Sequence, residues 1–530
     1  MNKEIYIYDT TLRDGSQAEG ISFTVKDKIS VARALRELGI PYIEGGWPGS
    51  NPKDAEFFKR IKKIKLSPSK LVAFGSTRRK NIPAYKDKNL QELIKSKPDA
   101  FCIFGKTSLT HVKDALRTTP EENLRMIKSS VNFLKKRGKK EVIYDAEHFF
   151  DGYFENSEYA LKTLSAALDG GADWIVLADT NGGTMPDDIA RITKTIKEKF
   201  PHAKVGIHAH NDCELAVANS LSAVDNGATM VQGTINGWGE RCGNANLSSI
   251  IPNLMLKKKL KIKNFTLKNL KKLTKISRYV DEVANLIPKR EQPYVGISAF
   301  AHKGGVHVSA VMRNPSTYEH VDPRIVGNER RILISELSGL SNLKLKSEQL
   351  GIKLKDRELA LQILREIKER EARGYQYEAA DASLKLFLKL KTGKIPEFFN
   401  VKSCRVILEY LKKPSLPAIE KRCEASIKLS VKGQIVYEVA EGDGPVNALD
   451  NTLRKSLTKF YPFLNEMTLT DFRVRVLNPK EATAAAVRVF IESRDRDERW
   501  TTVGVSEDII QASWNALIES FIYKLLKSHK

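Results

Sequence analysis

The segment Gly206-Ile207-His208-Ala209-His210-Asn211-Asp212 decides the fold that this sequence predicts. Residues Val205–His210 form a short apolar run that predicts a β-strand, and alternate side chains of a strand project from the same face. His208 and His210 could therefore share one metal ion. The next two residues end the strand and precede a predicted helix, Cys213–Val224. A His-x-His pair between a strand and a helix is where an α/β barrel would hold a divalent cation, although such pairs also occur as ordinary packed or surface histidines.

The same strand–helix unit recurs on both sides of this segment. Amphipathic runs such as Lys26–Leu38, Pro120–Lys136, Ser157–Leu168 and Pro186–Lys199 separate eight predicted strands: Ile5–Asp9, Tyr42–Gly45, Leu71–Gly75, Ala100–Phe104, Val142–Glu147, Trp174–Asp179, Val205–His210 and Thr229–Thr234. This alternation implies a parallel sheet, and its length is that of an α/β protein with a (β/α)8 TIM barrel. A doubly wound open sheet is the alternative, but no Gly-rich dinucleotide loop follows the first strand.

Polar residues gather at the carboxyl ends of these predicted strands. They occur in Asp9–Gly15, Glu44–Gly46, Asp145–Glu147, Asp179–Asn181, His208–His210 and Asn236–Asn244. In a barrel these ends form the catalytic face. A single acid at a strand end is usually a helix cap or a turn residue, but six ends with compatible groups favour an active site.

Four of these residues form a candidate metal site. Asp14, His208, His210 and Asn244 offer oxygen and nitrogen ligands without a thiolate, which favours Mg2+ or Mn2+ and leaves Zn2+ open. A 2-oxo acid could chelate such an ion, which would polarise its carbonyl.

Three further residues are candidates for substrate chemistry, each with a structural alternative. Arg13 could stabilise oxyanion charge or only form a salt bridge at the barrel rim. Glu147 could orient substrate or move a proton, or it could only support another side chain. Thr180 could bind a carboxylate or cap a helix.

Composition narrows the function further. The chain carries 88 Lys and Arg against 64 Asp and Glu, a net charge of +24, with lysines concentrated in segments such as Lys257-Lys258-Lys259-Leu260-Lys261-Ile262-Lys263. This pattern indicates either a nucleic-acid-binding stripe or a solvated basic surface, and no nucleic-acid motif accompanies it. No apolar run approaches the roughly 20 residues of a membrane span. No secretory signal is recognisable, and the five scattered cysteines lack a C-x-x-C motif, so we expect a cytoplasmic protein without disulfides.

The last 130 residues or so predict a different, α+β domain built from an internal βββα repeat. Its elements are Cys404–Leu411, Cys423–Val431, Gln434–Val439 and Val446–Leu457, then Thr468–Leu477, Ala484–Glu492, Trp500–Val505 and Asp508–Leu525. We predict a catalytic barrel over residues 1–265, linker subdomains over 266–400 and this domain over 401–530. The turn Gly442-x-Gly444-Pro445 lacks the lysine and serine of a P-loop, but a helix N-terminus there could bind a small carboxylate.

Long motifs resemble a known family. Asp9-Thr10-Thr11-Leu12-Arg13-Asp14-Gly15, His208-x-His210-Asn211-Asp212 and Gly233-Thr234-Ile235-Asn236-Gly237-x-Gly239-Glu240-Arg241-x-Gly243-Asn244-Ala245 are similar to the acyl-CoA-condensing enzymes related to 2-isopropylmalate and homocitrate synthases, over nearly the whole chain. Within that family, Glu44–Lys53 and Tyr318–Pro323 look most like the members that condense acetyl-CoA with pyruvate. The resemblance implies formation of (R)-citramalate and CoA, in isoleucine biosynthesis.

The resemblance also implies roles for particular residues. Metal binding falls on Asp14, His208, His210 and Asn244, and substrate contacts on Arg13 and Thr180, with Glu147 close by. His307 and Tyr318 would be the acid/base pair, often reaching the barrel of a partner chain. Without the resemblance, His302 and His307 would be read as surface residues. Ser309 stands where some relatives carry an acid, so we assign it no role.

The resemblance further implies a homodimer and feedback by isoleucine through the loop Gly442, Gly444 and Pro445, although a purely dimer-forming domain is the alternative. Three alternative functions remain open. They are a sister synthase with a larger 2-oxo acid, an aldol-type lyase on the same barrel, and a basic nucleic-acid-binding protein with an inactive barrel.

Overall fold

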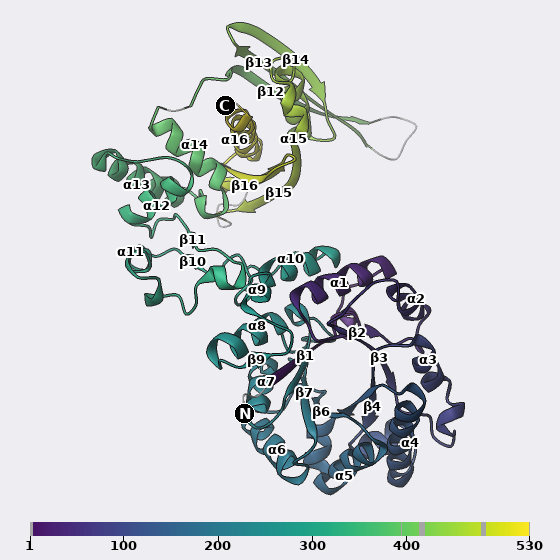
Figure 1. Ribbon diagram of the computed structural model, residues 1–530. Helices are drawn as coiled ribbons and strands as arrows, with labels where there is room; N and C mark the ends of the chain where they lie inside the picture. The colour runs from purple at the N-terminus through teal and green to yellow at the C-terminus, as the bar shows by residue number, and fades with distance from the viewer. Residues whose placement is uncertain (1–3, 394, 413–418, 479–483, 529–530) are drawn as a thin grey trace. The chain divides into compact units, whose positions relative to one another are not determined.

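A closed barrel forms the first part of the structure, a computed structural model that describes residues 4–393, 395–412, 419–478 and 484–528 (Figure 1). In this part of the chain eight parallel strands follow one another in order, and β1 pairs with both β2 and β8. The strands are β1 Glu4–Asp9, β2 Tyr42–Gly46, β3 Lys70–Ser76, β4 Ala100–Lys106, β5 Glu141–Glu147, β6 Trp174–Asp179, β7 Lys204–Ala209 and β8 Met230–Gly233. The predicted TIM barrel is confirmed, and the closure excludes an open doubly wound sheet.

Helices surround the barrel, as Figure 1 shows. They are α1 Val25–Leu38, α2 Pro52–Ile61, α3 Lys88–Ser96, α4 Pro120–Gly138, α5 Phe149–Gly170, α6 Pro186–Lys199, α7 Ala216–Asp225 and α8 Leu247–Pro252; a short strand β9 Lys261–Ile262 and helices α9 Leu267–Leu270 and α10 Leu273–Val283 follow. α1 begins with a reciprocal cap between Thr24 and Asp27. α7 begins three residues later than predicted, because Glu214 adopts φ +60° and Asn211 caps the amide of Ala216.

The barrel interior changes from apolar to polar along three of its strands, β2, β5 and β8. Its apolar part is a buried cluster of Tyr8, Tyr42, Val72, Phe74, Ala100, Cys102, Ile143, Trp174, Val176 and Met230. Two residues further along their strands, and so on the same face, Tyr42, Ile143 and Met230 are followed by Glu44, Asp145 and Gln232. The packed interior therefore supports a polar layer at the carboxyl ends of the strands.

Two compact units divide the chain, Met1–Phe300 with His320–Arg330, and Ala301–Glu319 with Arg331–Lys530. The second unit begins with β10 Ala301–His302, α11 Gly305–Arg313, β11 Arg331–Ile332, α12 Leu340–Gln349, α13 Arg357–Ala372 and α14 Asp381–Lys391. α12 ends at Gln349, just before Gly351 turns the backbone to φ +78°.

The predicted βββα repeat follows. Strands β12 Asn400–Lys412, β13 Ile419–Val431 and β14 Gln434–Glu441 form one antiparallel sheet with helix α15 Pro445–Leu457; β15 Thr468–Val476, β16 Val487–Arg494 and β17 Arg499–Ser506 form another with α16 Ile509–Ser528. Alternate residues of β13, such as Ala425, Ile427 and Leu429, are fully buried. The repeat arises because each amphipathic helix covers the apolar face of one sheet.

All five cysteines are free. Lysines of the segment 257–263 contact local partners: Lys258 pairs with Asp225 at 2.5 Å, and Lys257 donates to the carbonyl of His320 at 2.8 Å. Among the described residues, no helix combines the length and apolar character needed to cross a membrane.

Glu519 on α16 provides a pH-dependent contribution to stability. It accepts a hydrogen bond from the Ser383 hydroxyl of α14, and desolvation raises its pKa to about 7 against the opposing effects of Ser383 and Arg370. Its stabilising contribution is therefore fully present below the unfolded pKa near 4.3 and is lost as the pH rises toward 7. We expect Glu519→Gln to flatten this loss, which amounts to on the order of 2 kcal/mol, in denaturant unfolding of the full chain at pH 5 and pH 8.

The exposed Glu507 supplies the control for this prediction. The variant Glu507→Gln should keep the pH slope of the wild type, because it changes an exposed side chain outside the contact between Ser383 and Glu519. An unchanged slope in Glu519→Gln would show that the Glu519 carboxyl titrates normally.

Candidate active site

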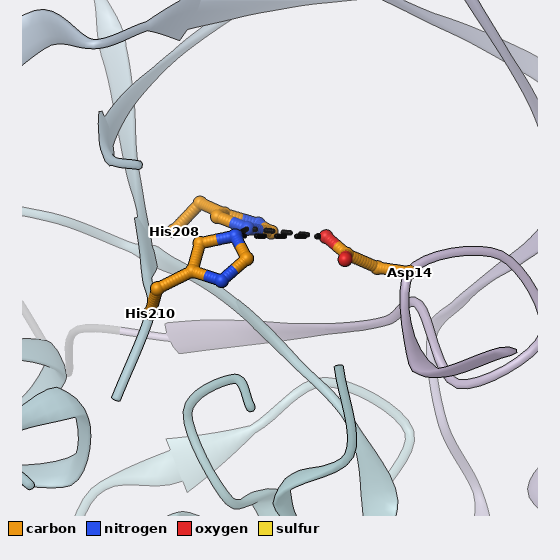
Figure 2. Close-up of side chains that lie close together, drawn as sticks. All are labelled: Asp14, His208 and His210. Atoms are coloured by element: carbon orange, nitrogen blue, oxygen red, sulfur yellow. Dashed lines mark hydrogen bonds and ion pairs between the residues drawn. The ribbon is translucent and has the colours of Figure 1, made fainter. Parts of the chain in front are cut away.

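A cluster of one carboxylate and two imidazoles lies at the mouth of the barrel (Figure 2). β7 carries His208 and directs His210 to the same side, while the turn after β1 carries Asp14. The two Nε2 atoms lie 3.3 Å apart, and Asp14 Oδ2 is 3.4 Å from His208 Nε2 and 4.0 Å from His210 Nε2. All three side chains are at least nine-tenths buried. The structure thus brings together residues that are about 200 positions apart in the sequence.

Two buried atoms beside this cluster have no hydrogen-bond partner among the described residues. They are His210 Nδ1 and Asn244 Oδ1. A β-bridge holds Asn244 against His210, and the Asn244 amide nitrogen donates to the carbonyl of Trp238 at 3.0 Å, so its oxygen remains available. Ligand atoms on one cation with bonds of about 2.1 Å lie roughly 3–4 Å apart. The donor set therefore fits a divalent cation.

The ionisation states of Asp14 and His210 also favour the binding of a cation. Burial alone would raise the pKa of the Asp14 carboxyl, but Arg13 and His208 outweigh it and hold that pKa well below its ordinary value. Burial lowers the pKa of His210 to about 4. Asp14 is therefore ionised and His210 neutral near pH 7, the forms in which they bind metals.

Arg13 is held in one orientation beside the cluster. Its Nε donates to Glu44 Oε1 at 2.6 Å, and its Nη1 lies 3.2 Å from Asp14 Oδ2. The guanidinium stacks 3.7 Å from the ring centroid of Phe74. Glu44 is fully buried and also accepts hydrogen bonds from Tyr8 and Thr10, so its charge requires the Arg13 cation.

Aromatic rings form a wall next to Arg13. Trp47 meets Phe74 and Phe104 edge-on at 5.8 and 5.6 Å, and Phe74 and Phe104 stack at 5.5 Å. Trp47 lines two cavities, one of about 180 Å³ that includes Arg13 and one of about 370 Å³ that includes Lys106. The ring of Trp47 is thus a boundary of the space beside the guanidinium.

Glu147 and Thr180 lie at the ends of the neighbouring strands β5 and β6. Glu147 pairs with Lys106 at 2.5 Å, and the Thr180 hydroxyl oxygen accepts a hydrogen bond from the amide of His148 at 2.8 Å. Since that bond uses an oxygen lone pair, the hydroxyl hydrogen of Thr180 is still available for a substrate. Arg241 donates to the Thr180 carbonyl at 2.8 Å and so anchors this strand end.

His307 and Tyr318 come together in the second unit. Their ring centroids are 4.3 Å apart, and both side chains are exposed. His302 instead pairs with Glu319 at 3.1 Å. The two residues of the predicted acid/base pair are therefore adjacent in the structure. They belong to a different unit from the cluster of Asp14, His208 and His210.

The loop Gly442–Pro445 leads into α15 as predicted. Gly444 is the N-cap residue and Pro445 the first helical residue. A side chain at Gly442 would come within 2.3 Å of the Ala448 amide nitrogen, so this close approach requires glycine.

The sequence placed Asp145 at a polar strand end without giving it a partner, and Gln232 was not predicted as part of the site. His208 Nδ1 lies 2.9 Å from Gln232 Oε1, and the Gln232 amide donates to Asp145 Oδ1 at 3.0 Å. Burial raises the pKa of Asp145 to about 6 despite the opposing charge of His208. The available signal was a glutamine in an otherwise apolar strand, Met230–Gly233, on its inward face.

A (β/α)8 barrel whose strand ends bear a carboxylate–imidazole cluster defines a class of metal-dependent barrel proteins. The family model described as HMGL-like matches residues 4–280, the homocitrate synthase post-HMGL domain-like model matches 294–374, and the LeuA allosteric (dimerisation) domain model matches 378–525. These three matches correspond, in order, to the barrel, the linker helices and the βββα repeat.

Curated relatives match the whole chain. The (R)-citramalate synthase of Aquifex aeolicus (strain VF5) is 53% identical over 531 residues, covering 100% of this chain and 99% of that protein. The (R)-citramalate synthase of Geobacter sulfurreducens is 55% identical, covering 99% and 98%. A 2-isopropylmalate synthase of Methanocaldococcus jannaschii is 30% identical, covering 99% and 96%. The chain belongs to the HMGL-like family and, within it, to the family of the (R)-citramalate synthases.

Proposed function

We propose that this protein condenses acetyl-CoA with pyruvate and releases (R)-citramalate and CoA. The observation that carries the proposal is the identity of 53–55%, over the full chain, to two (R)-citramalate synthases. The 2-isopropylmalate synthases among these relatives are less similar to the chain, at 30% and 38% identity, which favours pyruvate over a larger 2-oxo acid. The carboxylate–imidazole cluster at the barrel mouth is consistent with this chemistry.

The side chains at the barrel mouth have complementary roles in this proposal. A divalent cation held by Asp14, His208, His210 and Asn244 would act as a Lewis acid on the keto group. Arg13 donates hydrogen bonds to the oxygen that becomes negative during attack, and its fixed orientation favours this role. The Thr180 hydroxyl binds the substrate carboxylate.

Proton transfer is the remaining requirement, because the methyl group of acetyl-CoA is a weak acid. His307, adjacent to Tyr318, removes that proton, and Tyr318 assists it. Glu147, paired with Lys106, orients the substrate near the end of β5. Water then hydrolyses the citramalyl thioester.

The finer assignments belong to the same proposal. We propose Mg2+ or Mn2+ as the cation, because the ligand set contains no thiolate. The match to an allosteric (dimerisation) domain supports a homodimer with an allosteric effector. We propose isoleucine as that effector, bound near Gly442, Gly444 and Pro445. Five free cysteines are consistent with a reducing cytoplasm.

Release of free CoA tests the activity. The purified protein is assayed with acetyl-CoA and, in parallel, pyruvate, 2-oxoisovalerate and 2-oxoglutarate, with Mg2+ or Mn2+ present. We expect kcat/KM to be highest for pyruvate. A preference for either larger acid would replace the proposed substrate, and no CoA release with any of them would refute the condensation.

Trp47 should restrict the size of the 2-oxo acid. The variant Trp47→Ala removes a ring that lines both of these cavities. We expect kcat/KM for 2-oxobutyrate relative to pyruvate to rise by about 10-fold, the effect of one methylene in an apolar pocket. The half-buried Trp514, in the second unit, supplies a control, since Trp514→Ala should leave the ratio unchanged. Equal ratios in both variants would contradict the boundary role of Trp47.

A further inference from the structure

Behind His208 lies a buried chain of two hydrogen bonds. The parallel register of β7 and β8 sets His208 beside Gln232, and the His208 Nδ1 atom is 2.9 Å from Gln232 Oε1. On its other side Gln232 Nε2 donates to Asp145 Oδ1 on β5 at 3.0 Å. All three side chains lie in the barrel interior, and Gln232 is fully buried.

The direction of these bonds follows from the chemistry of the groups. A carboxylate such as Asp145 can only accept hydrogen bonds, so the NH2 end of the Gln232 amide must face it. The amide oxygen then faces His208, whose Nδ1 must carry the hydrogen. A neutral imidazole with a hydrogen on Nδ1 has its lone pair on Nε2.

That lone pair points to the candidate metal site. His208 Nε2 is the atom that lies 3.4 Å from Asp14 and 3.3 Å from His210. A glutamine that only filled space would gain nothing from its polar atoms, because burying an amide is unfavourable unless it is hydrogen-bonded. Both ends of the Gln232 amide are used, and one of them meets a candidate metal ligand.

We propose that Asp145 and Gln232 are positioning residues that hold His208 in the form protonated on Nδ1, so that Nε2 is available to bind a divalent cation. This rests on the proposed function, in which His208 is a metal ligand. Outer partners of this kind fix the orientation of a metal-binding histidine and make it a better ligand. Neither residue touches the cation or the substrate.

Binding of Mn2+ to the full-length chain tests the proposal. The protein is stripped with a chelator and titrated with Mn2+, and free Mn2+ is measured by electron paramagnetic resonance. We expect Gln232→Met, which has a similar shape without the amide, to bind Mn2+ about 10–100-fold more weakly. Gln292→Met is the matched control, because Gln292 is also buried in the first unit but bonds to Asn236 instead of a candidate ligand. Its Mn2+ affinity should equal that of the wild type.

Exchanging the carboxyl group of Asp145 and the amide group of Gln232 distinguishes an effect of hydrogen-bond direction from an effect of packing. Gln232→Glu alone places two carboxylates against each other, and Asp145→Asn alone lets the Gln232 amide turn either way, so both should weaken Mn2+ binding. In the double variant Asp145→Asn/Gln232→Glu, the new amide can donate to the new carboxylate, which again accepts from His208 Nδ1. We expect the double variant to bind Mn2+ within about 3-fold of the wild type.

The outcomes distinguish this inference from the proposed function. If the wild type binds Mn2+ and Gln232→Met binds it equally well, the positioning role is overturned while the metal site stands. The same holds if the double variant is no better than the weaker single variant while the melting temperatures of all metal-free proteins agree. If the wild type itself binds no divalent cation, the metal site fails and the positioning role fails with it.

Discussion

The variant His208→Ala is expected to lose CoA release by more than about 100-fold, above what the loss of an outer partner of a metal ligand costs. The imidazole contributes one of the three clustered ligand atoms, and without it the other proposed ligands, Asp14, His210 and Asn244, should hold the cation much more weakly. The fold should persist, because β7 keeps its backbone pairing to β6 and β8. Steady-state assays with pyruvate, together with circular dichroism, measure both effects.

Removal of the metal should have the same effect on CoA release as removal of its ligand His208. Treatment of the wild type with a chelator should abolish CoA release, and added Mg2+ or Mn2+ should restore it, whereas neither ion should restore His208→Ala. His202→Ala provides the control, because His202 is exposed and outside the cluster, so its activity should be unchanged. Full turnover by chelator-treated His208→Ala would disprove the metal role.

The variant Arg13→Met should lose both activity and stability. Without the guanidinium, the developing oxyanion loses a fixed donor, which typically costs 10²–10³ in kcat. The fully buried Glu44 carboxylate also loses its cation, which we expect to lower the free energy of unfolding by about 3–5 kcal/mol. Kinetics with pyruvate and chemical denaturation measure the two losses separately.

A double variant separates these two roles of Arg13. Arg13→Met/Glu44→Gln removes both charges, so most of the stability should return while kcat stays low. The exposed Arg33 supplies a control, since Arg33→Met should change the unfolding free energy by no more than about 0.5 kcal/mol. Recovery of kcat in the double variant would limit Arg13 to a structural role.

Local patterns were sufficient for much of the site. The alternation of side chains along β7 predicted that His208 and His210 share a face, and their Nε2 atoms are 3.3 Å apart. The eight strands were predicted because strand–helix alternation is a short-range pattern. Asp14 could be grouped with the histidines because the carboxyl ends of all barrel strands meet on one face.

The partners of these residues depend on contacts between strands that are distant in the sequence. The sequence did not reveal that Gln232 and Asp145, 87 positions apart, would meet behind His208. The boundary formed by Trp47, Phe74 and Phe104 also comes from three different strands or the turns after them. Such meetings follow from strand register and side-chain packing, which local periodicity does not encode.

The sequence by itself determined the barrel, the βββα repeat and the identity of the cluster residues, because hydrophobic periodicity and residue chemistry are properties of short segments. The tertiary structure alone decided which buried group faces which: Glu44 against Arg13, and Gln232 against His208. Those pairings exist only once the chain has closed, since closure sets the register that brings each donor to its acceptor.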